Sequence, residues 1–260
     1  MRLVTWITVL LLAVGEGAAF AQSAPAGSQT PAASMAGVKD PAALALLKRM
    51  CDRLQTAKTF TVRGRTSLEL PIAGGELATF YNDFDTSVRR PDGLASRRTG
   101  DLPDFRFAFD GKSMTVHVPS LAEWGTTSAP ATLDALLPAM SEEGGLNIPF
   151  DELLVADPYA AVTAGVNEAE MAGPAMIGGK KVEHIVLSGA EFRIEYWIDP
   201  GTALPARSLV VYVDHPLRPH FGVEYTEWKL DPKLPASTFS LPKPQGATEV
   251  SFRDAAGAFR

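Results

Sequence analysis

The sequence predicts an α+β fold that is mainly β, in which a curved antiparallel sheet carries its helices on one side. Short segments rich in β-branched and aromatic residues alternate with turn residues over residues 60–118 and 169–230. One helical segment precedes the first run of strands, and a short helical insert separates the two runs. Runs of strands with segregated helices are typical of this fold class, so we expect one large domain.

The alternation of side chains is clearest over residues 182–230, which predict four consecutive strands. The apolar residues that share one face are Phe192, Ile194, Tyr196 and Ile198 in one strand and Phe221, Val223 and Tyr225 in another. A period of two with one apolar face indicates a half-buried strand of an antiparallel sheet. The Asp-Pro-Gly sequence at 199–201 predicts the turn between two of the strands, because proline presets φ and glycine accepts a positive φ.

The first 21 residues predict a signal peptide. Arg2 provides a positive charge, residues 3–14 are a short apolar run, and Ala19 and Ala21 are the small residues that a signal peptidase requires. The apolar run is shorter than the roughly 20 residues that span a bilayer. We therefore expect cleavage after Ala21, a periplasmic location and no transmembrane span. Residues 22–39, rich in Ala, Pro and Ser, are expected to form a disordered linker.

The folded domain is expected over residues 40–250, with a flexible tail at 251–260. It begins with an amphipathic helix, capped by Asp40 and with Pro41 at its first position. The strands of the first run are expected at 60–70, 76–88, 93–98, 105–109 and 113–118. Asp-Gly at 110–111 is a strong hairpin signal between two of them.

The middle of the chain predicts short helical elements. Thr132 is placed to cap a helix that ends at Gly144, and residues 150–154 and 158–163 predict two further helical turns. A hairpin that starts at residue 169 then leads into the second run of strands. The expected order is therefore helix, strands, helical insert and strands.

Several local sequences together resemble a known family. These are Val-Arg-Arg-Pro-Asp at 88–92, Phe-Asp-Gly-Lys at 109–112, Trp-Ile-Asp at 197–199 and Leu-Pro at 204–205. With the N-terminal helix and the insert, they resemble the predicted periplasmic proteins grouped as a domain of unknown function (number 2092), related in fold to the LolA/LolB lipoprotein-carrier superfamily. The resemblance covers about residues 40–245. It implies an unclosed β-barrel with the N-terminal helix and the insert as a lid, around a hydrophobic cavity that takes acyl chains in the carriers.

Composition and motifs argue against other classes of function. The net charge of −6 disfavours nucleic acid as a partner. Common nucleophile, phosphate-binding and zinc motifs are missing from the sequence, so we expect no enzyme, no cofactor and no metal. Asp83 and Asp85 are interpreted as a solvated strand face. Asp214, His215 and His220 share a loop but match no common zinc spacing.

Two functions remain as the main hypotheses, with an unrecognised enzyme as a third. The first is a monomeric binding protein for a hydrophobic ligand, such as a lipid or the acyl chain of a lipoprotein. The second is a module that binds or senses an envelope protein, in which the same core is filled and holds no ligand. For the first hypothesis, the expected ligand-binding residues are Phe80, Phe84, Phe192, Ile194, Tyr196, Val211, Val223 and Tyr225. The sequence does not decide which face of the sheet is concave.

Overall fold

The computed structural model describes residues 37–144, 146 and 148–257. The predicted signal peptide, its cleavage site after Ala21 and linker residues 22–36 lie outside the described residues. In chain order the elements are α1 (Pro41–Thr56), β1 (Thr59–Pro71), β2 (Leu77–Arg89), β3 (Gly93–Gly100), β4 (Phe105–Phe109), β5 (Ser113–Val118), η1 (Pro119–Leu121), β6 (Glu123–Ser128), α2 (Leu133–Gly144), η2 (Asp151–Leu153), α3 (Pro158–Thr163), β7 (Val166–Ile177), β8 (Lys180–Gly189), β9 (Phe192–Asp199), β10 (Leu204–Tyr212), β11 (His220–Leu230), η3 (Ala236–Phe239), β12 (Thr248–Ser251) and α4 (Phe252–Ala256).

The described strands form one 12-stranded sheet in the order β12-β6-β5-β4-β3-β2-β1-β11-β10-β9-β8-β7. All neighbours pair antiparallel except β12 and β6, which are parallel. The pairing of β1 with β11 joins the two predicted runs of strands in the middle of the sheet. β12 and β7 form the two edges and do not pair with each other, so the sheet is not closed into a barrel. The predicted fold class is confirmed.

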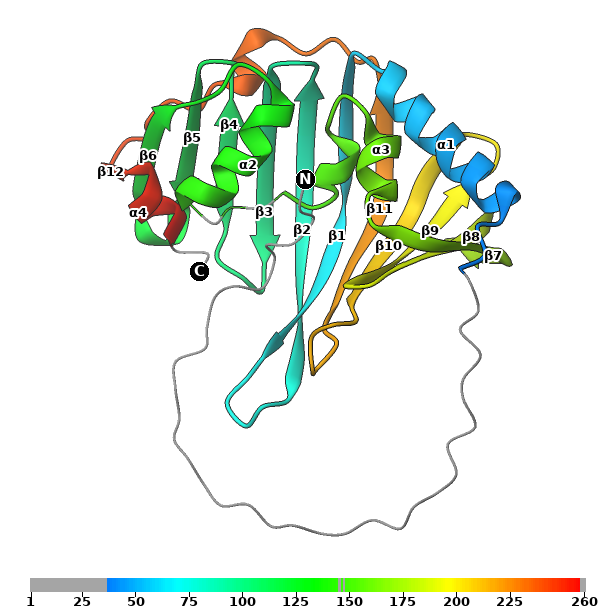
Figure 1. Ribbon diagram of the computed structural model, residues 1–260. Helices are drawn as coiled ribbons and strands as arrows, with labels where there is room; N and C mark the ends of the chain where they lie inside the picture. Colours follow the sequence, from blue (N-terminus) through cyan, green and yellow to red (C-terminus); the bar gives the residue numbers. More distant parts are fainter. Residues whose placement is uncertain (1–36, 145, 147, 258–260) are drawn as a thin grey trace.

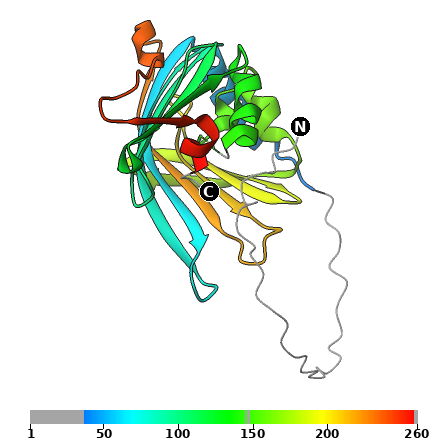
Figure 2. The ribbon, with the colours of Figure 1, turned by 90° about the vertical axis from the view of Figure 1, so that its left-hand side faces the viewer.

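The helices lie on one face of this sheet, which we call the inner face (Figure 1). α1 packs against β7, β8 and β10, and the insert of α2, η2 and α3 lies over the middle strands. Figure 2 shows the sheet curving around the insert. The structure thus decides the question that the sequence left open, because the inner face is the concave one.

The start of α1 follows from local sequence. The Asp40 carboxylate accepts a hydrogen bond from the Ala42 N–H at 2.8 Å, and Pro41 occupies the first turn, as predicted. One side of the helix buries Leu47, Met50 and Leu54 completely against the sheet. In this way an amphipathic helix closes one end of the inner face.

A glycine sits where β1 changes register. The pairing of β1 with β11 shifts between Arg63 and Gly64, which marks a β-bulge. A Cβ atom at position 64 would meet the Glu224 carbonyl oxygen at 2.1 Å and the Phe84 ring at 2.8 Å. Only glycine therefore allows the three strands to approach each other closely at this point.

Three elements differ from the sequence prediction. β6 and β12 were not predicted, because the mostly polar residues of β6 show no apolar alternation and β12 is only four residues long. The expectation of a flexible tail from residue 251 is wrong for residues 251–256. Ser251 caps α4, and Phe252, Ala255 and Ala256 are buried in the core, where α4 packs on β5, β6 and α2.

Within the described part of the chain, no helix is both long and apolar enough to cross a membrane.

Candidate functional site

Seven of the eight predicted ligand-binding residues lie on the inner face. Phe84, Phe192, Ile194, Tyr196, Val223 and Tyr225 are buried there, and Phe80 is half-buried further along β2. Val211 does not join them. It pairs with Arg193 and His220, so it lies on the outer face although it is 1% exposed. The inner face is therefore divided into a covered part and an open part.

The covered part is filled by the protein's own insert. The Phe150 ring lies 5.2 Å from the Phe84 ring centre, 5.6 Å from that of Tyr225 and 6.5 Å from that of Trp228. Phe150 has a φ of 57°, a left-handed conformation that is uncommon for an aromatic residue. Two predicted ligand-binding residues, Phe84 and Tyr225, thus pack against Phe150.

A polar contact links the insert to the sheet beside this aromatic cluster. The Tyr196 hydroxyl, fully buried on β9, donates a hydrogen bond to Glu152 Oε1 at 2.7 Å. The Tyr225 and Ser208 hydroxyls form a second hydrogen bond of 3.1 Å. Sequence reasoning missed Glu152. The available signal was the acidic pair Asp-Glu within the apolar run at 148–154.

The two acids of η2, Asp151 and Glu152, have pKa values above the ordinary range of carboxyl groups. Burial and the neighbouring Glu152 charge raise the pKa of Asp151 to about 8, and burial also raises the pKa of Glu152. The two side chains share a hydrogen bond, which favours a proton on Asp151. Burial raises the pKa of Tyr196 as well, so its hydroxyl stays a donor to Glu152.

Arg90 holds the end of η2 in place. Its guanidinium donates hydrogen bonds to the carbonyl oxygens of Leu153 at 2.9 Å, of Val155 at 2.7 Å, and of Leu154. The guanidinium also lies over the Phe60 ring, 5.7 Å from its centre. One side chain from the end of β2 therefore satisfies three carbonyls of the insert.

Arg90→Gln is expected to lower the unfolding free energy by about 2–3 kcal/mol, because partly buried carbonyls lose charged donors. Urea denaturation would measure this loss. Arg63→Gln is the matched control, since Arg63 is a solvent-exposed arginine whose ion pairs lie on the outer face. Equal stability of the Arg90→Gln and Arg63→Gln variants would contradict this role for Arg90.

The open part of the inner face begins where the helices end. In Figure 1 the β1–β2 and β10–β11 hairpins extend below the helices. An apolar row crosses four strands there, because successive partners pair directly across β2, β1, β11 and β10. All its members are half-buried. We call it the distal row: Phe80, Leu68, Phe221 and Val210.

A hollow of about 70 Å³ lies between the distal row and the insert. Leu68 and Phe221 of the distal row line it, together with Phe84 and with Pro149 of the insert. Its polar lining comes from Thr66, Asn82, Ser96 and Arg98. The inner face thus combines an open apolar surface with a small, mainly apolar recess that contains a few polar side chains.

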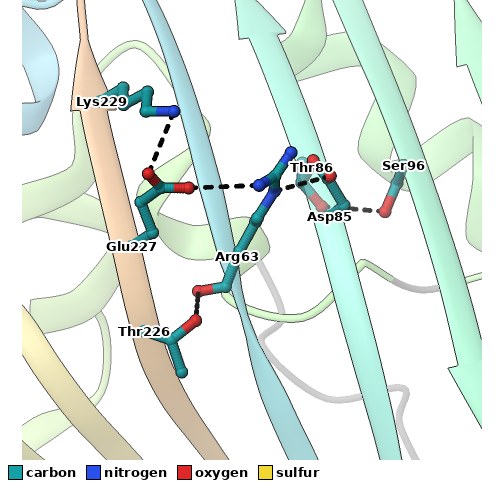
Figure 3. A network of polar contacts seen from close by, with 7 residues as sticks. All are labelled: Arg63, Asp85, Thr86, Ser96, Thr226, Glu227 and Lys229. Atoms are coloured by element: carbon teal, nitrogen blue, oxygen red, sulfur yellow. Dashed lines mark hydrogen bonds and ion pairs between the residues drawn. The ribbon is translucent and has the colours of Figure 1, made fainter.

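The outer face is charged and exposed. Figure 3 shows Arg63 between Asp85 and Glu227, with nitrogen–oxygen distances of 2.8 and 3.4 Å, and Lys229 beside Glu227 at 3.0 Å. Arg65 pairs with Asp83 in the same way at 2.8 Å. The two aspartates considered as an acidic pair therefore each face an arginine on a solvated strand face, in agreement with the sequence interpretation.

A metal site is not evident among the described residues. No cluster of three or more His, Cys, Asp or Glu side chains there is arranged to hold a metal ion. Cys51 is buried in α1, and burial raises the pKa of its thiol to about 12, which suits a packed core residue. His184 stacks on Trp197 at 4.1 Å and contacts Glu195 at 2.9 Å within the sheet.

Comparison with known proteins gives a family. Residues 43–253 match the family model described as "Predicted periplasmic protein (DUF2092)". No curated protein matches the chain at a significant level.

Several solved structures are similar in outline. MucB is 12% identical with a TM-score of 0.43, covering 79% of this chain and 65% of its own. The Mycobacterium tuberculosis lipoprotein LppX is 16% identical with a TM-score of 0.45, covering 73% of this chain and 96% of its own. A putative outer membrane lipoprotein-sorting protein domain from Vibrio parahaemolyticus is 11% identical with a TM-score of 0.35, covering 76% and 96%.

The family match spans most of the chain and agrees with the resemblance found in the sequence. The chain belongs to the DUF2092 family of predicted periplasmic proteins.

Proposed function

We propose that this protein is a non-catalytic periplasmic protein that binds a hydrophobic ligand, a lipid or the acyl chain of a lipoprotein, on the open part of its half-barrel. The distal row carries the proposal. It is a continuous apolar surface across four strands, concave and only half-buried. A concave apolar surface with a few polar groups beside it is the usual form of a small-molecule site.

The energetics favour an acyl chain as the ligand. Each methylene removed from water contributes about 0.8 kcal/mol, so even a partly buried chain gains several kcal/mol. In this proposal Phe80 and Val223 remain in or next to the ligand site. Phe84, Tyr196 and Tyr225 do not contact the ligand in this proposal. They lie between the sheet and the insert and hold the insert in place. The predicted signal peptide, cleaved after Ala21, would deliver the protein to the periplasm.

The first test uses the mature protein purified from periplasm without detergent. Native mass spectrometry followed by organic extraction should detect and identify a bound lipid. A clean apo mass, together with no binding of a fluorescent fatty-acid probe, would exclude the carrier function.

Phe80→Asp is expected to weaken binding of the fluorescent fatty-acid probe by at least about tenfold, because a carboxylate would have to be desolvated beneath the chain. Tyr81→Asp is the matched control. Tyr81 is the next residue of the same strand, 52% exposed, on the opposite face. A fluorescence titration of both variants measures the difference. Equal loss in the two variants, or none in either, would remove the distal row from the site.

One observation favours the alternative of an envelope protein-interaction or sensing module without a ligand. The covered part of the half-barrel is occupied by Phe150, whose ring packs against those of Phe84, Tyr225 and Trp228. In that case the mature protein carries no lipid, and a protein partner binds an outer surface. Failure of both lipid measurements, with a partner recovered by cross-linking in the periplasm, would establish this alternative.

A further inference from the structure

The hollow beside the distal row is too small for an acyl chain. Its volume is about 70 Å³. For comparison, an apolar cavity of roughly 150 Å³ holds one benzene molecule, and one water occupies about 30 Å³ in the liquid. The hollow has the size of a carboxylate or a phosphate group. A chain attached to such a group would have to lie outside the hollow. The distal row is the adjoining apolar surface, because Leu68 and Phe221 belong to both.

Asn82 lines this hollow and carries a side-chain amide. The side chain is 2% exposed, and its Oδ1 accepts a hydrogen bond from the Leu102 N–H at 3.0 Å. Because a backbone N–H can only donate, this contact fixes the orientation of the amide group. Among the residues that the structure describes, none accepts a hydrogen bond from Asn82 Nδ2. Buried polar groups are usually hydrogen-bonded, so an amide N–H without a protein acceptor at the wall of a hollow indicates that a ligand's oxygen could bind there.

Arg98 supplies a positive charge to the same hollow and is held in position. Its Nη2 donates to the Pro103 carbonyl oxygen at 2.8 Å, and its guanidinium lies over the Phe105 ring at 4.8 Å. No carboxylate is found among the described residues that line the hollow. Burial lowers the pKa of Arg98 to about 10, although the charge of Asp104, outside the lining, acts in the opposite direction. The guanidinium therefore stays charged at neutral pH in surroundings that are largely apolar.

We propose that the ligand is an anionic amphiphile whose carboxylate or phosphate head binds Arg98 and Asn82 in the hollow while its acyl chain lies along the distal row. This inference rests on the proposed function and adds the chemical class of the head group. An arginine fork and an amide N–H are both donors suited to carboxylate and phosphate oxygens. An apolar surface that begins at the rim of the hollow receives the chain.

The test compares three probes with the same chain and different heads: decanoate, decyl phosphate and decanol. Calorimetric titration of the mature, delipidated protein should give at least about tenfold tighter binding of one or both anions than of the alcohol, the worth of one charge-assisted contact. Preference for decanoate identifies a fatty acid as the ligand class, and preference for decyl phosphate identifies a phospholipid. Equal affinity for all three overturns the inference but leaves the proposed function intact. Failure of all three to bind overturns both.

Variants locate the head group. Arg98→Gln is expected to abolish the preference for the anions and leave decanol binding unchanged, and Arg98→Lys should retain part of the preference. Arg97→Gln is the matched control, because Arg97 directly precedes Arg98 in β3 and is exposed on the outer face, paired with Asp85. Asn82→Asp is a second test. The new carboxylate can still accept the hydrogen bond from the Leu102 N–H, but it repels an anionic head, so the preference for the anions should be lost. A preference that survives both Arg98→Gln and Asn82→Asp would place the head elsewhere and overturn the inference.

Discussion

The unfolding free energy is expected to fall as the pH rises from about 4 to about 8, at a steepest slope of about 1.4 kcal/mol per pH unit for one proton. The cause is Asp151, whose pKa rises from an ordinary 3.8 to about 8 on folding. A raised pKa means that the folded state binds the proton more tightly. The stabilisation is therefore fully present below the unfolded pKa and is lost as the pH rises through the folded one.

The groups packed around Asp151 and Glu152 do not obscure this effect. Burial raises the pKa values of Tyr196, Tyr212 and Tyr225 on the sheet, so these hydroxyls stay neutral over the range. Cys51 on α1 also stays protonated, with a pKa of about 12. Burial lowers the pKa of His117, so its contribution has the opposite sign and is complete once the pH exceeds the ordinary histidine value of 6.5. Between about pH 6.5 and 8 the pH dependence therefore reports mainly on the acidic pair.

Asp151→Asn is expected to flatten the profile and to make the protein more stable than the wild type at pH 8. Urea denaturation at several pH values would measure both effects. Glu142→Gln, an exposed acid on α2 of the same insert, is the control and should leave the slope unchanged. A wild-type profile that is flat, or that rises with pH, between about pH 6.5 and 8 would show that Asp151 does not carry the proton.

Phe150→Ala is expected to lower the unfolding free energy by about 3–5 kcal/mol, the usual cost of removing a buried phenylalanine ring. The ring contacts Phe84, Tyr225 and Trp228, and its loss leaves a cavity between the insert and the sheet. This cavity adjoins the hollow, because Phe84 contributes to both. We therefore expect the variant to bind the fluorescent fatty-acid probe at least as tightly as the wild type despite its lower stability.

The control for this prediction is Phe239→Ala. Phe239 is 1% exposed in η3, where its ring faces Arg89 and not the inner-face aromatic cluster. Its removal should destabilise the protein without changing probe binding. Thermal melts and fluorescence titrations would separate the two effects. Loss of probe binding in Phe150→Ala alone would mean that the ring itself forms part of the ligand site.

Local sequence determined most of the secondary structure. Alternation at Phe192, Ile194 and Tyr196 predicted a strand with one buried face, and the Asp40-Pro41 pair predicted the start of α1; both are confirmed. Periodicity and turn chemistry act over a few residues, so a sequence pattern can display them directly. β12 and α4 were missed because their stability comes from packing on β6 and the core.

The candidate site depended on contacts between distant residues. The alternation of β2 places Phe84 and Phe80 on the same face, but only the position of the insert buries Phe84 under Phe150 and leaves Phe80 half-exposed. Val211 lies on the face opposite the other seven residues, which the sequence could not show because its strand is apolar on both faces. Asn82 and Arg98 line the same hollow because β2 and β3 pair side by side. The sequence around either residue therefore gives no sign of the hollow.

The family, the mainly β fold and the apolar stripes of the strands could therefore be predicted from local sequence patterns. The tertiary structure decided which face is concave, which aromatic residues the insert covers and where a charged recess meets the open apolar row. The physical reason is that alternation records which side chains leave water. It does not record whether the chain's own insert or a ligand covers them.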